Sequence, residues 1–389
     1  MPAIARIAQY ADELTRWRRD IHAHPELGFE EQRTSAFVAE QLGRFGCEVH
    51  RGVGRTGVVG VLRAGNSPAT IGLRADMDAL PIRETNDFAY RSQNDGRMHA
   101  CGHDGHTTML LGAARYLAET RGFDGTVNFI FQPAEEGLGG AQAMIADRLF
   151  ERFPCDAIFG MHNRPGLGIG KFAVRQGPVM AGGAYFDIAI VGRGAHAARP
   201  ETGIDPVLVA SHITTALQSI IARNVRPLDT AVVSVTQIHA GEAYNVIPAS
   251  AVLRGTARAF SRDILGLIEA RMRKIATGIA EGMGASATLD FRVIFPPLVN
   301  NAEAARFIGD CAAEIVGPEN VDRAGTLTMA SEDFAYMLEQ RPGAYVQIGN
   351  GDGEGGCEVH NPGYDFNDAA LTIGASLFAR IVEQKLARP

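Results

Sequence analysis

The order of helical and β-type segments changes near residue 182, and this change limits the chain to two kinds of domain. Before it, short runs rich in β-branched residues alternate with segments of helical periodicity, which is typical of an α/β domain with a largely parallel sheet. The β-type runs cover residues 56–62, 69–81, 126–131 and 156–162, and the helical segments cover 4–21 and 30–45 and restart near 105.

The block from 183 to 295 has a different order. A glycine-bounded β-type run is followed by a helix, two adjacent β-type runs, a second helix and a last β-type run, which is the ferredoxin-like order. Further helices and one β-type run follow, from 302 onward and at 331–339, 344–349 and 367–386. The sequence therefore predicts a discontinuous α/β domain, residues 1–182 and 296–389, that carries an inserted α+β domain, residues 183–295.

Composition and charge exclude several partner classes. A length of 389 residues favours two domains, and a net charge of −7 argues against nucleic acid and anionic membranes as partners. The first 20 residues lack the apolar segment of a secretory signal, and no stretch approaches 18 apolar residues, so we expect a cytoplasmic protein that spans no membrane. Five widely separated cysteines argue against a disulfide framework.

Residue types that bind metals are concentrated in "MHACGHDGH", residues 98–106. Thiolate and imidazole suit divalent transition metals, and the glycine between Cys101 and His103 permits a tight loop. Other polar residues end the apolar strands, where function collects in parallel sheets. These are Asp76, Asp78, Glu135, Glu136 and His162, and a glycine-rich loop at 349–356 leads to His360. Such a set predicts a metal site with a carboxylate left for proton transfer.

Each of these residues also has an ordinary structural explanation. A single histidine at a strand end is more often structural than a ligand, adjacent glutamates more often lie on a solvated surface, and a single cysteine is more often an inert core thiol. Glu135 and Glu136, however, follow an apolar strand and a proline, and Cys101 has histidines on both sides. The stretch CGHDGH, residues 101–106, is the sharpest local signal and favours Cys101 as a ligand, whereas the other residues indicate a metal site only as a set.

Eight motifs occur in a fixed order along essentially the whole chain. They are HAHPELGFEE (22–31), RADMDALP (74–81), MHACGHDGHTTMLLGAA (98–114), FQPAEEG (131–137), GMHN (160–163), GRGAHAARP (192–200), SEDF (331–334) and HNPGYDFND (360–368). Together they closely resemble the aminoacylase and carboxypeptidase metallohydrolase family, in its hippurate hydrolase and auxin-conjugate hydrolase branch. The resemblance implies a catalytic domain of the zinc-peptidase type, with a phosphorylase/hydrolase-like fold, and an inserted dimerisation or lid domain.

The resemblance also implies roles for individual residues around two divalent metal ions. Asp76 occupies a position where the broader family has histidine, a departure typical of this branch, and Asp78 would orient a ligand. His106 is left open between a helix start, a supporting contact and a substrate contact. Cys101 would bridge the metals, and the other ligands would be His103, Glu136, His162 and His360, with Glu135 as the general base.

In the inserted domain, the resemblance implies three substrate contacts. His196 matches a histidine that reaches a substrate oxygen, in relatives often from a partner subunit. Asn245 and Arg258 match positions that hold the substrate carboxylate or the lid. The ordinary alternatives are a solvated loop histidine and a surface charge at a strand edge.

The implied reaction is hydrolysis of the amide bond of an N-acyl or N-aroyl amino acid, such as hippurate, to a carboxylic acid and a free amino acid. Water would be activated at the binuclear site with Glu135 as the base. The alternatives are a dipeptidase or carboxypeptidase, a deacetylase of N-acetyl amino-acid precursors, or an inactive metal-binding homologue. The metal is left open among manganese, zinc, cobalt and nickel, and the assembly between a homodimer and a homotetramer formed through the inserted domain.

Overall fold

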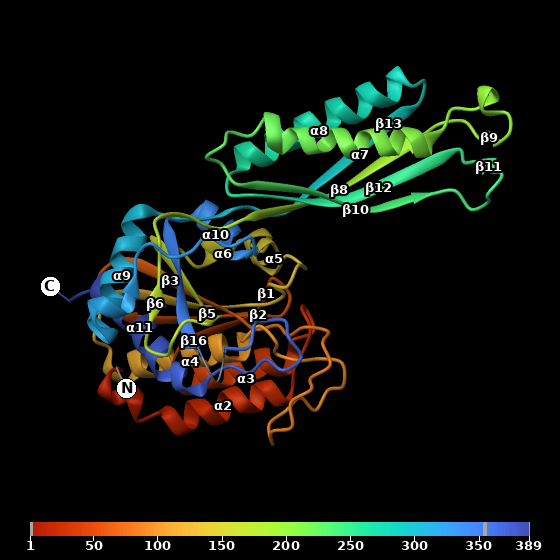
Figure 1. Cartoon of the computed structure of the whole chain (residues 1–389). Helices are drawn as coiled ribbons and strands as arrows, with labels where there is room; N and C mark the ends of the chain where they lie inside the picture. Colours follow the sequence, from red (N-terminus) through yellow and green to blue (C-terminus); the bar gives the residue numbers. More distant parts are fainter. Residues whose placement is uncertain (1–2, 353–355, 389) are drawn as a thin grey trace. The chain divides into compact units, whose positions relative to one another are not determined.

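The computed structural model describes residues 3–352 and 356–388, which divide into two compact units (Figure 1). Unit 1 comprises Met1–Gly177, Val299–Thr326 and Asp333–Pro389, and unit 2 comprises Pro178–Leu298 and Leu327–Glu332. The predicted insertion, residues 183–295, lies within unit 2. The domain assignment itself stays a prediction, because compactness alone does not show that a segment folds independently.

Unit 1 is built around an eight-stranded sheet in the order β1-β2-β4-β3-β5-β16-β6-β15. The central strands β4, β3, β5 and β16 are parallel, and antiparallel pairs occur toward both edges. This arrangement confirms the predicted α/β class with a mostly parallel sheet. The strands are β1 Glu48–Val53, β2 Gly57–Ala64, β3 Thr70–Asp76, β4 Gly125–Gln132, β5 Ala157–Pro165, β6 Phe172–Ala173, β15 Val321–Asp322 and β16 Gly343–Gly351.

Helices flank this sheet (Figure 1). The helix α4, His103–Thr120, packs on β3 and is itself covered by α2 and α11, while α5 and α10 pack together on β4 and β5. Every residue of β4 is buried, as expected for a strand covered on both faces. The other helices are α1 Ala5–Ala8, α2 Ala11–Ala23, α3 Gln32–Arg44, α5 Gly140–Ala146, α6 Leu149–Arg152, α9 Ala302–Val316, α10 Phe334–Gln340 and α11 Leu371–Lys385, with 3-10 turns η2 Pro318–Asn320 and η3 Asp368–Ala370.

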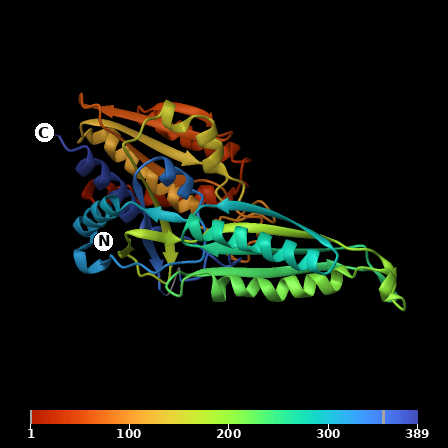
Figure 2. The same cartoon turned by 90° about the horizontal axis from the view of Figure 1, so that it is seen from above.

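Unit 2 has a four-stranded antiparallel sheet in the order β10-β12-β8-β13, with helices α7 and α8 side by side (Figure 2). The predicted β-α-β-β-α-β order is therefore confirmed. The side chains of Asp205 and Ser261 cap the N-termini of α7 and α8. The apolar faces of the two helices pack on the sheet and bury Phe186 and Ile188. The elements are β8 Gly182–Val191, α7 Pro206–Arg223, β10 Ala231–Ala240, β12 Ser250–Ala259, α8 Arg262–Gly282 and β13 Ser286–Phe295, with η1 Pro200–Thr202 and a small ribbon of β9 Ala195–His196 and β11 Val246–Ile247. The chain passes from one unit to the other four times. Two of these passages lie in β7 Gly177–Met180 and β14 Leu298–Asn300, and the other two flank the segment Leu327–Glu332.

Several boundaries differ from the sequence predictions. The helix predicted over 4–21 is two helices, α1 and α2, and the periodicity continues across the break because Ile7, Tyr10 and Leu14 enter one core. The strand predicted over 69–81 ends at Asp76, because its neighbour β4 ends in the same register and Pro133 follows without an N–H group. The predicted loop at 349–356 begins later, since β16 continues to Gly351, and residues 353–355 lie outside the described residues.

Two further predictions concern the whole chain. The cysteines at 47, 101, 155, 311 and 357 are all free thiols, which agrees with the expected absence of a disulfide framework. Within residues 3–352 and 356–388, no helix combines the length and the apolar character needed to cross a membrane.

Candidate metal centre

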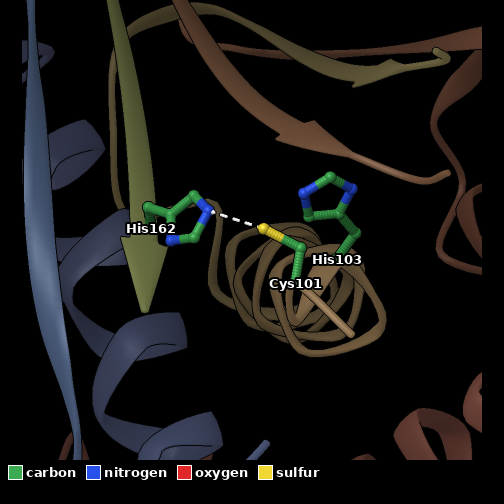
Figure 3. Close-up of side chains that lie close together, drawn as sticks. All are labelled: Cys101, His103 and His162. Carbon is green, nitrogen blue, oxygen red and sulfur yellow. Dashed lines mark hydrogen bonds between the residues drawn. The ribbon is translucent and has the colours of Figure 1, made fainter. Parts of the chain in front are cut away.

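Cys101 and His103 project from the same end of α4 (Figure 3). Gly102 between them has a left-handed φ of 93°. A Cβ atom there would lie 2.4 Å from Asn163 Oδ1 and 2.6 Å from Tyr364 Oη. Glycine is therefore required, both for its conformation and for this close packing, and it allows two ligand-type side chains to share one short loop.

His162 on β5 faces the Cys101 thiol (Figure 3). Its Nε2 lies 3.3 Å from Cys101 Sγ, and its Nδ1 lies 2.6 Å from the Asn163 carbonyl oxygen. Since the Nδ1 hydrogen is donated to that carbonyl, the Nε2 lone pair points toward the sulfur. Burial, reinforced by the neighbouring His106, lowers the pKa of His162 to about 3. The ring is therefore neutral, which is the form that binds metals.

His103 has a buried ring nitrogen without a hydrogen-bond partner. Its Nδ1 lies 3.3 Å from Asp78 Oδ1, whereas its Nε2 makes no hydrogen bond to any residue in the described part of the chain. Carboxylate oxygens of Asp76 and Glu136 lie 3.9 and 4.0 Å from this Nε2. Because buried polar atoms are almost always satisfied, the free nitrogen fits a ligand for a cation.

Asp78 contacts two of the predicted ligands at once. Its Oδ1 is the partner of the His103 ring, and its Oδ2 accepts a hydrogen bond of 3.0 Å from the backbone N–H of Glu136. Carboxylates that hold metal-ligating residues in this way fix the orientation of the ligands. The geometry therefore supports the predicted orienting role of Asp78.

His360 reaches the cluster from a loop near the C-terminus. Its Nε2 lies 3.2 Å from Glu136 Oε1, and its side chain is 50% exposed, whereas the His103 side chain is fully buried. The backbone N–H of His360 donates to the Ala100 carbonyl at 2.7 Å. This bond joins the loop of His360 directly to the loop of Cys101.

All five predicted ligands thus come together in unit 1. Ligand atoms within each of three groups lie within 4.8 Å of one another. The groups are Cys101, His103 and His162; Cys101, Glu136 and His360; and His103, Glu135 and Glu136.

The electrostatics of the cluster favour a bound cation. Burial raises the pKa of the Cys101 thiol well above its usual range, and the carboxylates of Glu136 and Glu135 raise it further. Burial opposes a charge on His103, yet Asp76 and Asp78 outweigh it and raise the pKa of that ring to about 10. Divalent metals would displace protons from these thiol and imidazole groups and bind the same thiolate, imidazole and carboxylate donors.

Glu135 is buried at the turn after β4. Its Oε1 lies 3.3 Å from the backbone N of Asp333, which donates to it. The preceding residue, Ala134, has a left-handed φ of 51°, so the chain bends sharply before Glu135. Glu135 and Glu136 consequently make different contacts although they are adjacent, which is what separate roles require.

His106, whose role the sequence leaves open, uses both ring nitrogens inside unit 1. Its Nδ1 lies 2.6 Å from Asp76 Oδ1, and its Nε2 lies 2.7 Å from Asn163 Oδ1. The ring is buried 4.6 Å from the ring of His162, measured between centroids. These contacts occupy both ring nitrogens of His106, although Asp76, His103 and His106 also place ligand-type atoms within 4.8 Å of one another. Asp76 is in turn bonded to buried Arg74 at 2.7 Å.

The three residues predicted in the inserted domain lie in unit 2. His196 and Asn245 are neighbours at the exposed ribbon, where Ala197 N donates to the Asn245 carbonyl and His196 pairs with Val246 across β9 and β11. Arg258 is half-buried on β12, and its guanidinium donates to Ser331 Oγ.

Several buried residues with clear contacts to the cluster were not singled out from the sequence. Asn163 and Tyr364 form a hydrogen bond of 2.6 Å that links the region of His162 to the loop of His360. Arg74 lies inside the buried strand β3 and bonds Gln132 at 2.9 Å. Of these residues, Arg74 could have been recognised from the sequence, because a charged residue inside a buried strand needs a partner.

Comparisons with known proteins agree with this geometry. The model of the peptidase family M20/M25/M40 matches residues 72–384. A hippurate hydrolase of Campylobacter jejuni is 44% identical over 98% of this chain and 98% of its own length. An IAA-amino acid hydrolase (ILR1-like 4) of Arabidopsis thaliana is 39% identical over 98% of this chain and 88% of its own.

A solved structure extends the comparison to the fold. A Bacillus subtilis protein described as a dinuclear metal binding peptidase of the M20 family superposes with a TM-score of 0.86. It is 34% identical to this chain, and the match covers 97% of this chain and 99% of that one.

Proposed function

We propose that this chain, which belongs to the peptidase family M20/M25/M40, is a metal-dependent amidohydrolase that releases an amino acid from its N-acyl or N-aroyl derivative. The observation that carries the proposal is the cluster of thiol, imidazole and carboxylate groups around the buried and unpartnered His103 Nε2. The similarity to a hippurate hydrolase over the whole chain supports the same activity.

Two divalent cations would be held by the five predicted ligands, with Cys101 shared between them. When bound, such ions polarise a carbonyl group and make water acidic enough to lose a proton at neutral pH. These ligands are Cys101, His103, Glu136, His162 and His360.

Glu135 would act as the general base and then as the general acid. It takes the proton from the attacking water and returns it to the leaving amine nitrogen, so that a single carboxylate carries the proton through the reaction. Its position supports this role, because Glu136 has the ligand contacts while Glu135 is held separately by the backbone of Asp333.

The residues of unit 2 would bind the substrate. His196 would donate to the carbonyl oxygen as negative charge develops on it, and Arg258 and Asn245 would hold the carboxylate of the amino acid. The exposure of His196 supports a role in contacting a ligand more than a role in the core.

The assembly and the location of the protein follow as further parts of the proposal. We expect a homodimer or homotetramer formed through the inserted domain, since β10 is an edge strand that exposes Val232 and Ile238. We expect it to act in the cytoplasm, as its five free thiols favour a reducing compartment. Light scattering of the purified chain would measure its mass.

The function is tested by amino-acid release from hippurate. Chelator-stripped protein should be inactive, and manganese, zinc, cobalt or nickel should restore release. Glu135→Gln should lower kcat by about 10²–10⁴-fold while two metal equivalents stay bound. Near-normal turnover by Glu135→Gln would show that the base is another group.

The same assay separates the alternatives. Matched N-acetyl amino acids, N-aroyl amino acids and dipeptides would be compared under the restoring metal. Preference for dipeptides would indicate a peptidase, and preference for N-acetyl substrates a deacetylase. Failure with all three classes, in protein that retains metal, would indicate an inactive homologue.

A further inference from the structure

Glu31 is a fully buried carboxylate in the segment before α3. Its Oε1 accepts a hydrogen bond of 2.9 Å from the backbone N–H of Ala134, and its Oε2 accepts one of 2.5 Å from the Thr56 hydroxyl. Thr56 is itself 5% exposed. The carboxylate thus bridges the start of β2 and the turn that carries Glu135, although more than 100 residues separate Glu31 from that turn.

The arrangement is costly for stability alone. Burial raises the pKa of Glu31 to about 7, and the bonds from Thr56 and Ala134 only partly oppose this. In the described residues, no lysine, arginine or histidine forms an ion pair with Glu31. Burying a carboxyl group without a counter-ion opposes folding, so its presence here points to a purpose other than packing.

The residue whose amide bonds Glu31, Ala134, has an unfavourable backbone conformation. Ala134 has a φ of 51°, a region that a residue with a Cβ rarely adopts. On its other side, the Ala134 carbonyl accepts a hydrogen bond of 3.0 Å from Gly140 N. Gly28 approaches so closely that a Cβ there would lie 3.0 Å from Ala134. Both polar groups of this residue are therefore bonded, and its conformation determines where the next side chain, Glu135, points.

We propose that Glu31 is a positioning residue of the hydrolase: its carboxylate holds the Ala134 amide in the left-handed conformation and thereby directs Glu135 toward the attacking water. The inference rests on the proposed function, in which Glu135 is the base. Within the described part of the chain, the Glu31 carboxylate is bonded to Thr56 and Ala134 and to none of the five predicted ligands.

The test compares Glu31→Ala with Glu31→Gln in the metal-loaded protein. Alanine removes the acceptor, and a lowering of kcat by about 10–100-fold is expected, with KM and metal content unchanged, because small displacements of a reacting group cost this much. Glutamine keeps an amide oxygen for Ala134 and an NH2 group for Thr56, so it should recover most of kcat. Thr56→Val, which leaves Glu31 in place, should lower kcat in the same sense by a smaller factor.

Asp124→Ala is the matched control. Asp124 also accepts backbone hydrogen bonds, at 2.7 Å from both Asn66 N and Ser67 N, but it lies just before β4 begins, at the opposite end of that strand from Glu135. Its loss should lower the melting temperature and leave kcat unchanged.

Three results would overturn the inference. One is a kcat of Glu31→Ala within twofold of the parent, another is a loss that follows metal content or folded fraction, and the third is a loss that glutamine does not recover. Glu135→Gln is measured alongside: if it stays active, the proposed base is refuted and Glu31 has nothing to position. If Glu135→Gln is inactive and Glu31→Ala is normal, only the inference about Glu31 is refuted.

Discussion

The predicted ligands of unit 1 and the predicted substrate residues of unit 2 are held in very different ways. His103 is buried and His162 is half-buried, and each has a ring nitrogen bonded to a neighbouring oxygen. His196 and Asn245 lie on an exposed two-stranded ribbon with two residues in each strand. Groups that must coordinate an ion benefit from fixed positions, whereas groups that bind variable substrates tolerate mobility.

The largest effect is expected from a change among the predicted ligands of unit 1. Cys101→Ala removes the predicted ligand that two of the candidate metal-binding groups share. We expect this variant to lose metal. We also expect kcat to fall by more than the roughly 10²–10³-fold that the loss of an oxyanion donor costs. Metal analysis and hippurate hydrolysis would measure both, with Cys311→Ala on α9 as the control. Full metal content in Cys101→Ala would contradict the ligand assignment.

A smaller effect is expected on the exposed side. His196→Ala should lower kcat by about 10²–10³-fold, as expected for a group that stabilises a developing oxyanion. Metal content and melting temperature should not change, because the ring of His196 is exposed on the ribbon. His239→Ala, an exposed histidine on β10, is the control. If His196→Ala also lost metal, the assignment of His196 as a substrate contact would be contradicted.

The support around the ligands should matter less than the ligands. Asp78→Asn keeps the size of the side chain but removes the charge opposite the His103 ring. A loss of about 10–100-fold in metal affinity is expected, as for other orienting partners of metal ligands. Metal titration would measure it, and Asp229→Asn is the control, because the half-buried Asp229 pairs with Arg226 and not with a histidine. Unchanged affinity in Asp78→Asn would mean that the backbone alone orients His103.

The smallest effect concerns stability and its dependence on pH. Burial would lower the pKa of His22, but its bonds to Asp104 at 2.8 Å and Glu84 at 3.1 Å outweigh burial and the repulsion of Arg18, and raise it to about 9. The stabilisation is therefore complete below the unfolded pKa of about 6.5 and disappears as pH rises through about 9, on the order of 1–3 kcal/mol. Thermal melts at pH 6 and pH 10 should show this loss in the parent chain. If His22→Gln lost as much stability between pH 6 and pH 10 as the parent chain, the pH dependence would come from groups other than His22.

The sequence predicts the elements better than their ends, and the ligands better than their supports. Apolar periodicity reflects which residues enter the core. It therefore continues across the break between α1 and α2 and does not reveal where one helix ends and the next begins. Cys101 and His103 are recognisable because thiol and imidazole groups are rarely found so close together. Glu31 is an ordinary glutamate in the sequence, and only its contact with a distant backbone amide distinguishes it.

The same reasoning explains why the role of His106 could not be predicted. A histidine at the start of a helix can be a ligand, a cap or a support, and the choice depends on the oxygens that meet its two nitrogens. Those oxygens come from Asp76 on β3 and Asn163 on β5, and no local pattern records their approach.

The bond between His360 and Ala100 has a consequence for the time at which the protein becomes active during synthesis. Cys101 leaves the ribosome long before the loop that carries His360, and β16, which fills the gap between β5 and β6, is also made late. A nascent chain therefore has an incomplete central sheet and an incomplete set of predicted ligands until β16 and the loop of His360 have been made. Tight metal uptake should consequently be a late event, which makes it a natural reporter of completed folding in a translation reaction.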